Sequence, residues 1–295
     1  MKLGIDLGGT KIEIIAINDK GTELLRRRIP SPQDGYSSTL KAIARLVQTA
    51  ETELGQHGTV GIGTPGTISR VTGLLKNSNS VQLNGKSILQ DLEALLQRPI
   101  KLCNDANCFA LSEATDGAAA GASVVFGIII GTGTGAGIVV NGQVLTGPNG
   151  IAGEWGHNPL PWPDKEELPG PECYCGKRGC IETFLSGPGL MKLHLFETGN
   201  ALTPEEIVTR AEVGDASCEH SLQHYENRLA RSLAHAINIL DPDIIVLGGG
   251  MSNIERLYSS IPQLWGRWIF SDRVDTRLVK NKFGDSSGVR GAAWL

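Results

Sequence analysis

The chain has 295 residues and an ordinary globular composition, with 40% hydrophobic and 20% charged residues. Its formal net charge of −4 provides no basic surface for nucleic acid or anionic lipid, so neither partner is expected. Asp6 interrupts the first apolar run, which argues against a secretory segment, and no stretch approaches the ~20 apolar residues of a membrane helix. We therefore expect a cytoplasmic protein with one large or two modest domains.

Strand and helix patterns alternate along the chain. In the first part they predict a hairpin at 2–17, a helix at 39–54, a strand at 59–66, a helix at 87–96, a strand at 99–107 and a helix at 107–122. In the second part they predict two strands at 124–142, an irregular segment at 143–181, a helix at 218–240, a strand with a glycine turn at 241–253 and a short helix at 286–295.

Each part opens with two apolar runs around a turn rich in glycine and threonine, and the two openings are weakly similar to each other. This indicates an α/β fold that is duplicated, with a cleft between the halves. We expect an N-terminal domain at 1–113 and a C-terminal domain at 114–295, whose last helix could pack back on the first domain.

Three glycine-rich turns are candidates for nucleotide binding: Gly8-Gly9-Thr10-Lys11, Gly131-Thr132-Gly133-Thr134-Gly135 and Gly248-Gly249-Gly250. Exposed N–H groups in such turns bind anions, and glycine lets the backbone approach a phosphate closely. A hairpin turn needs glycine in any case, so one such turn alone predicts little. The three together favour nucleotide binding.

Two acidic positions fall where a strand pattern meets a turn. Asp6 precedes the first glycine turn, where its carboxylate could reach Mg²⁺ or simply cap the turn. Asn104 and Asp105 follow the apolar run 99–103, and ligands bind at the carboxyl ends of strands in open α/β sheets. Asp105 could accept a proton from a substrate hydroxyl that attacks the γ-phosphorus of ATP, or could serve only as a helix N-cap.

Further polar residues lie in or beside the irregular segment, namely Glu154, His157 and Glu182. Carboxylates and imidazoles that are fixed in a cleft suit the recognition of sugar hydroxyls, because each can accept from O–H groups. Their spacing alone does not establish this role.

Cys173, Cys175 and Cys180 form a C-x-C-x4-C group. Three thiolates leave a tetrahedral Zn²⁺ one ligand short, and His157 is the nearest histidine, so we propose a closed, structural Cys3His site. A disulfide or redox switch, or no metal, is the alternative, although C-x-C is not the usual C-x-x-C redox spacing. The other cysteines and histidines are expected to be inert, surface or packing residues: Cys103, Cys108, Cys218, His57, His194, His220, His224 and His235.

Six segments carry a resemblance: LGIDLGGTK (3–11), GTPG (63–66), ND (104–105), IIIGTGTGAGIVVNG (128–142), GEWGH (153–157) and CYCGKRGCIE (173–182). They resemble the ROK family (repressors, open reading frames and sugar kinases) from residue 3 to the C-terminus. Within that family, EWGHNPLPW, PECYCGKRGCIETF and GDSSGVRGAAWL are most similar to bacterial mannofructokinases, also called fructokinases.

The resemblance implies an actin/hexokinase-like (ribonuclease H-like, duplicated) two-domain α/β fold that closes over ATP and a hexose. Asp105 matches the family's catalytic base, which acts on the sugar 6-hydroxyl. The matches to sugar-binding positions are Gly66, Asn79, Asn104, Asp105, Glu154, His157 and Glu182. The matches to the phosphate-binding turns are Gly4, Ile5, Asp6, Leu7, Gly8, Gly9, Thr10, Lys11, Gly131, Thr132, Gly133, Thr134, Gly135, Ala136, Gly137 and Ile138.

His157 with Cys173, Cys175 and Cys180 matches the family's zinc site. In this interpretation zinc fixes the irregular segment, turns the second ring nitrogen of His157 toward the sugar and anchors Glu182.

The expected function is an ATP- and Mg²⁺-dependent hexose 6-kinase of the fructokinase type, acting on D-fructose and secondarily on mannose. A glucokinase or an N-acetylglucosamine kinase would share every motif, and a sugar-sensing regulator without turnover is a more distant alternative. ROK repressors carry an N-terminal DNA-binding module, whereas the phosphate turn here begins at Gly4, so none is expected. A homodimer is expected from the resemblance alone.

Overall fold

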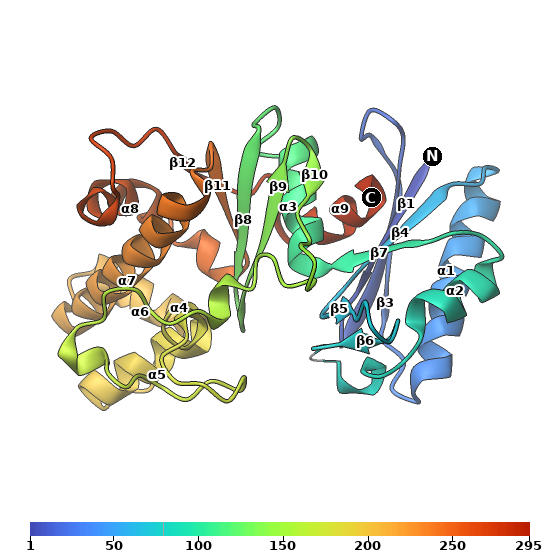
Figure 1. Ribbon diagram of the computed structural model, residues 1–295. Helices are drawn as coiled ribbons and strands as arrows, with labels where there is room; N and C mark the ends of the chain where they lie inside the picture. Colours follow the sequence, from blue (N-terminus) through green and yellow to red (C-terminus); the bar gives the residue numbers. More distant parts are fainter. Residues whose placement is uncertain (79) are drawn as a thin grey trace. The chain divides into compact units, whose positions relative to one another are not determined.

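The computed structural model describes residues 1–78 and 80–295 (Figure 1). It divides into two compact units: the first comprises Met1–Gly121, Gly137–Ala152 and Asp285–Leu295, and the second comprises Ala122–Ala136 and Gly153–Gly284. Residue 113, where the domain boundary is expected, lies inside a helix, α3 (Asp105–Thr115). Among the described residues, no helix is both long and apolar enough to cross a membrane.

The first sheet has the strand order β3-β2-β1-β4-β7. Its strands are β1 (Lys2–Leu7), β2 (Lys11–Ile17), β3 (Glu23–Pro30), β4 (Thr59–Thr64) and β7 (Lys101–Asn104). The first three strands form an antiparallel meander, whereas β4 pairs parallel with both β1 and β7. A separate two-stranded ribbon joins β5 (Thr67–Ile68) and β6 (Leu75–Lys76). The carboxyl ends of β1, β4 and β7 therefore lie at one edge.

The two faces of this sheet bury different residues, because successive side chains of a strand alternate. Leu3, Ile5 and Leu7 of β1 belong to the apolar core that also holds α1 (Tyr36–Leu54) and α2 (Ile88–Leu96). Figure 1 shows these two helices on one face and α9 (Ser287–Trp294) on the other.

Helix α9 packs directly on the backbone of the first sheet. A Cβ on Gly61 of β4 would lie 1.9 Å from the carbonyl oxygen of Ala292, and one on Gly291 of α9 would lie 1.6 Å from that of Cys108. No side chain fits at either position, so glycine is required for α9 to seat between the sheet and α3.

The second sheet has the strand order β10-β9-β8-β11-β12, with β11 parallel to both β8 and β12. Its strands are β8 (Val124–Ile130), β9 (Thr134–Val140), β10 (Gln143–Val144), β11 (Ile244–Gly248) and β12 (Arg277–Lys280). The remaining helices are α4 (Ile181–Leu185), α5 (Gly187–Thr198), α6 (Pro204–Glu212), α7 (Ala216–Leu240) and α8 (Leu257–Leu264). Helix α7 contacts each of the other four.

Most predicted elements are confirmed, including the hairpin at 2–17, the long helix at 218–240 and the irregular segment at 143–181. The helix predicted at 107–122 is shorter and begins earlier, at Asp105, because the Asn104 side chain caps it. The structure adds β3, α5, α6, α8 and β12, which the sequence patterns did not predict.

Candidate active site

In the first unit, polar side chains gather where the parallel strands end. Asp6 on β1 is in register with Gly63 of β4, and Thr64 of β4 is in register with Asn104 at the end of β7. Because these strands run in the same direction, Asp6 and Asn104 project from the same edge of the sheet. This is the edge where open α/β sheets bind ligands.

Asn104 and Asp105 form the start of α3, and it is Asn104 that acts as the N-cap. Its Oδ1 accepts hydrogen bonds from the backbone N–H groups of Ala106 (3.0 Å) and Asn107 (3.4 Å), and its Nδ2 donates to the Gly66 carbonyl at 3.3 Å. The alternative that Asp105 is merely the cap is therefore wrong. Asp105 is the first helical residue, and one of its oxygens, Oδ1, accepts from Ala106 N–H at 2.9 Å.

The two aspartates of this edge are difficult to ionise. Burial raises the pKa of Asp105, against the opposing effect of its hydrogen bond from Ala106. Burial, followed by the charges of Asp105 and Glu13, raises the pKa of Asp6 to about 6. A pair of neighbouring carboxyls with raised pKa values suits proton transfer or cation binding. Shifted pKa values of this kind are typical of functional sites.

Replacing Asp6 by asparagine is expected to stabilise the fold at alkaline pH. Since the folded pKa of Asp6 lies above its ordinary value of 3.8, the protonated carboxyl favours folding at low pH. That contribution is lost as pH rises through about 6, which leaves an ionised, poorly solvated group. A shift of two units corresponds to about 3 kcal/mol, so the gain of Asp6→Asn at pH 8 should exceed that at pH 5 by about 1–3 kcal/mol.

Urea unfolding at the two pH values measures this difference, with Asp19→Asn, a surface carboxylate, as control. An equal effect of Asp6→Asn at both pH values would contradict the assignment.

The first glycine turn connects β1 to β2. The Gly8 N–H donates to the Lys11 carbonyl at 3.0 Å, and the Ser31 hydroxyl donates to the Gly8 carbonyl at 2.7 Å. Gly9 and Thr10 at its tip are exposed. The backbone at the tip is therefore open to an anion, as the nucleotide prediction requires.

In the second unit, Thr134 links the second glycine turn to two predicted sugar-binding segments. Its backbone N–H donates to Oε2 of Glu182 at 2.8 Å, and its carbonyl oxygen would lie 2.1 Å from a Cβ on Gly156. The GEWGH turn can thus approach β9 only because residue 156 is glycine. The Thr134 hydroxyl is buried and has no hydrogen-bond partner among the described residues.

Trp155 anchors the turn that carries Glu154 and His157. Its ring is buried, meets Phe126 of β8 edge to face at 5.9 Å and donates an N–H to the Ser232 carbonyl at 3.3 Å. The two polar residues flank this anchor and remain accessible. The sequence patterns did not predict a role for Trp155. A large apolar residue between two predicted sugar-binding residues, Glu154 and His157, was the available sign that it anchors the turn.

The third glycine turn lies beside the second. Gly248 at the end of β11 is in register with Ile129 of β8, and a Cβ on Gly249 would lie 2.4 Å from the Ile130 carbonyl. The structure therefore brings the second and third glycine turns to one sheet edge, together with Glu182.

The cysteine cluster is assembled as the spacing suggests. One ligand atom from each of His157, Cys173, Cys175 and Cys180 lies within 4.8 Å of the others. Cys173 Sγ lies 3.5 Å from His157 Nδ1, and Cys175 Sγ lies 3.6 Å from Cys180 Sγ. All six cysteines of the chain are free. Three sulfurs and one imidazole nitrogen are the donor set of a closed zinc site, so the residues fit this metal.

The other ring nitrogen of His157 is occupied. His157 Nε2 lies 2.9 Å from the hydroxyl of Tyr174, and the two rings meet edge to face at 5.0 Å. Contact between this nitrogen and a sugar therefore requires the exposed Tyr174 to swing away. Tyr174 was not predicted as a site residue, although it stands between the first two cysteines.

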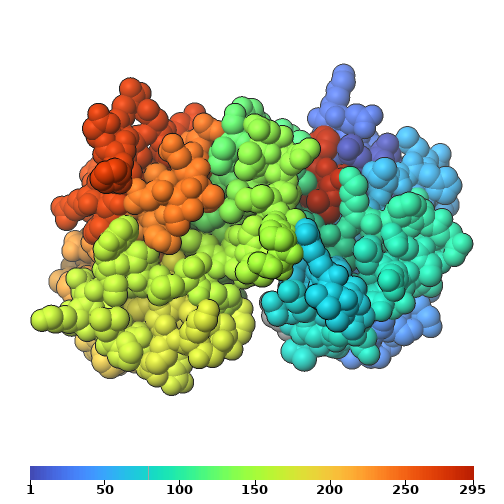
Figure 2. Space-filling model, in the orientation of Figure 1, coloured from blue at the N-terminus to red at the C-terminus, as the bar shows by residue number. Residues whose placement is uncertain are grey.

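The irregular segment has a second attachment that the sequence did not reveal. Both oxygens of the buried Glu167 accept from Arg231 Nη2, at 2.8 and 2.9 Å, and Arg228 Nε lies 2.8 Å from Oε1. This ion cluster ties the segment to α7. Figure 2 shows residues 153–181, in yellow-green, on the surface of the second unit.

Other predicted nucleotide-binding residues lie within strands. The side chains of Ile5, Leu7, Ala136 and Ile138 are buried in apolar surroundings, and Gly4 and Gly137 pack against neighbouring backbone. Only the main chain of these residues is available to a nucleotide. Asn79, a predicted sugar-binding residue, lies outside the described residues.

Comparison with known proteins places these features in a family. The chain matches the ROK family over residues 2–295. It is 41% identical over 301 residues to the N-acetyl-D-glucosamine kinase of Pasteurella multocida, covering 100% of this chain and 99% of the relative. It is 40% identical over 299 residues to the N-acetyl-D-glucosamine kinase of Photobacterium profundum, with the same coverage.

Solved structures agree. The ROK hexokinase from Thermus thermophilus gives a TM-score of 0.88 at 32% identity, over 99% of this chain and 97% of that one. A ROK family glucokinase from Streptomyces griseus, in complex with glucose and AMPPNP, gives 0.79 at 25% identity, over 100% and 98%. This chain belongs to the ROK family. Its two mixed five-stranded sheets match ROK kinase structures, so the predicted actin/hexokinase-like two-domain α/β fold is confirmed.

Proposed function

We propose that the protein is an ATP-dependent sugar kinase that phosphorylates the 6-hydroxyl of N-acetyl-D-glucosamine. The family match over residues 2–295 supports a ROK sugar kinase. The observation that carries the finer assignment is about 40% identity, over the full chain, to N-acetyl-D-glucosamine kinases. These relatives favour the amino-sugar alternative over the fructokinase that the segments 154–162, 171–184 and 284–295 suggested.

The proposed base is Asp105. Its position at the carboxyl end of β7, and its buried surroundings, suit a carboxylate that takes the proton from a sugar hydroxyl as that oxygen attacks the γ-phosphorus. The raised pKa makes it a stronger base once it is ionised. Glu154, His157 and Glu182, with Asn104 and Gly66, are the proposed contacts to the sugar.

The proposed phosphate contacts are backbone groups of the three glycine turns, where N–H donors can face developing negative charge. Asp6 lies beside the first turn and is the proposed ligand of Mg²⁺, which would be directly bound or water-bridged. Zinc, held by the cysteine cluster, would contribute only structure. Within the chain itself, the link from Cys180 through α4 to Glu182 and Thr134 transmits that order to the second glycine turn.

The substrate assignment is tested by coupled ADP release with Mg-ATP and a panel of N-acetylglucosamine, glucose, fructose and mannose. We expect the highest kcat/KM for N-acetylglucosamine. A clear preference for fructose would restore the fructokinase interpretation, and a preference for glucose would make the protein a glucokinase. Absence of sugar-dependent ADP release would refute the kinase itself and favour a sugar sensor.

A further inference from the structure

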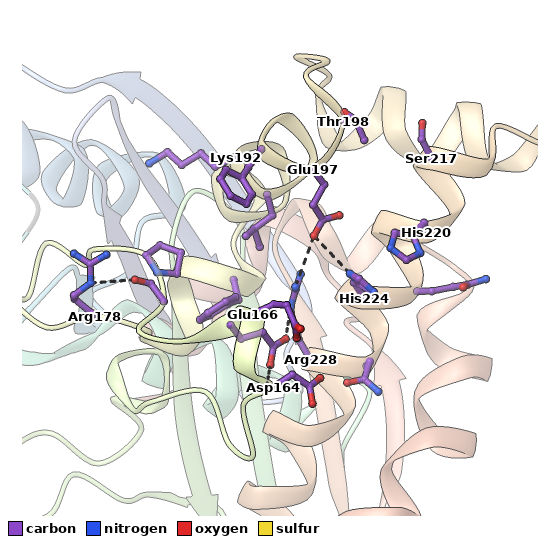
Figure 3. Close-up of a pocket in the computed structure, with 18 of the residues that line it drawn as sticks. Asp164, Glu166, Arg178, Lys192, Glu197, Thr198, Ser217, His220, His224 and Arg228 are labelled. Carbon is purple, nitrogen blue, oxygen red and sulfur yellow. Dashed lines mark hydrogen bonds and ion pairs between the residues drawn. The ribbon is translucent and has the colours of Figure 1, made fainter.

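A second cluster of metal-binding side chains lies outside the cysteine site. The second unit has a pocket of about 1380 Å³, which is lined by residues of α5 and α7 and by six residues between Asp164 and Arg178 (Figure 3). Two histidines of α7, His220 and His224, face this pocket one helical turn apart. Glu197, near the end of α5, points toward them in Figure 3.

The three side chains are close enough to share one ion. Their ligand atoms all lie within 4.8 Å of one another, and the two imidazole rings have centroids 4.1 Å apart. Glu197 Oε1 lies 3.5 Å from His224 Nδ1. Two donors on a tetrahedral ion with bonds of about 2.0–2.1 Å are separated by about 3.4 Å, so this pair already has the spacing of two ligands.

The His224 nitrogen that faces Glu197 lacks an ordinary hydrogen-bond partner among the described residues. His224 Nδ1 is buried from solvent, and at 3.5 Å its approach to Glu197 is too long for a good N–H···O bond. A buried ring nitrogen aimed at a carboxylate across this gap is the arrangement that a shared cation would complete.

One neighbouring charge opposes a cation there. Arg228 Nη2 lies 3.9 Å from Glu197 Oε1. However, its guanidinium is already paired with the buried Glu167, at 2.8 Å. That carboxylate also accepts from Arg231, so it offsets only part of the field of Arg228 at the cluster.

We propose that His220, His224 and Glu197 form a second metal site, which takes a first-row divalent transition metal such as Zn²⁺. Two imidazoles and a carboxylate suit this class of ion better than Mg²⁺ or Ca²⁺, which prefer oxygen ligands. Two histidines at i and i+4 share one helix face, which allows both to reach one ion. Three protein ligands leave a position open toward the pocket.

Such a site would cross-link α5 to α7, since Glu197 and the histidines come from different helices. The open position would accept water or an anionic small molecule that enters the pocket. This site is separate from the cysteine cluster in its residues and its chemistry, with no sulfur ligand.

The test uses the full protein with one zinc per chain, which the cysteine site holds, and Ni²⁺ alone as the probe of the second site. Calorimetric titration should detect one bound Ni²⁺ per chain while the bound zinc stays in place. His224→Ala and Glu197→Gln each remove one metal ligand, so each should raise the Kd for Ni²⁺ by about tenfold or more. His57→Ala is the matched control, because His57 also faces a carboxylate, Glu51 at 3.0 Å, but has no second histidine beside it.

A second readout keeps the test independent of folding defects. Ni²⁺ should raise the melting temperature of the wild type and of His57→Ala, and should leave that of His220→Ala unchanged. The reason is that an ion stabilises the folded state only when it binds to it. Absence of Ni²⁺ binding to wild type that carries one zinc per chain would overturn the proposal. Binding that persists unchanged in His220→Ala and His224→Ala would overturn it equally, because the ion would then lie elsewhere.

Discussion

Replacing Asp105 by asparagine is expected to lower kcat for sugar phosphorylation by about 10²–10⁴-fold, the usual contribution of a general base. Asparagine keeps the size of the side chain and can still accept from the Ala106 N–H, so the start of α3 should survive. It cannot take a proton. Because the loss is confined to chemistry, sugar and ATP binding should change little.

Steady-state kinetics and sugar-binding calorimetry on the same preparation separate these effects. Asp215→Asn is the matched control, since Asp215 also sits at a helix start and accepts from Ser217 and Cys218 N–H groups. It should retain wild-type kcat. If Asp105→Asn retained most of the activity, another group would have to be the base. If it lost sugar binding together with kcat, its role would be positional.

Removal of zinc is expected to weaken the sugar site while leaving the base in place. Cys180 directly precedes α4, and Glu182 of this helix accepts a hydrogen bond from the Thr134 N–H. Loss of the metal should therefore loosen both Glu182 and the second glycine turn. Burial also raises the pKa of the Cys180 thiol to about 12, so a bound cation is needed to keep a thiolate there.

We expect Cys180→Ser to lose the metal and about 10–100-fold of activity, mainly as a higher KM for the sugar. Its melting temperature should fall as well. Elemental analysis, kinetics and thermal unfolding are compared with Cys218→Ala, a buried cysteine of α7 outside the cluster. A protein that is purified without zinc, or a Cys180→Ser variant with unchanged KM, would contradict the structural role of the metal.

Sequence patterns predicted the elements that have strong periodicity. The alternation of apolar residues around Gly8 and Gly9 predicted β1 and β2, which pair as expected. By contrast, β3 carries Arg26, Arg27 and Arg28 in succession, which hides its strand character. Two of these arginines bond or pair with the buried Glu13 across the sheet, a contact that becomes visible only in three dimensions.

Some missed elements did carry a local signal. Helix α6 begins with Thr203, Pro204 and, at the third helical position, Glu206, and the structure shows a capping box there. That combination is a recognised helix start.

The candidate site was predictable in residue type but not in arrangement. The cysteine spacing and His157 pointed to one metal donor set, and the structure assembles it. The hydrogen bond between Glu182 and Thr134 joins residues 48 positions apart in the sequence, and no local pattern encodes it. The contact of Tyr174 with His157 was likewise hidden, because an exposed tyrosine between two cysteines has many possible orientations.

The most direct test of the central claim is to identify the product formed from N-acetyl-D-glucosamine and Mg-ATP by mass spectrometry and ³¹P NMR. The account predicts one sugar monophosphate for each ADP, with the phosphorus coupled to the protons on carbon 6. Phosphate on another carbon would refute the proposed reaction, as would ADP release with free phosphate and unchanged sugar.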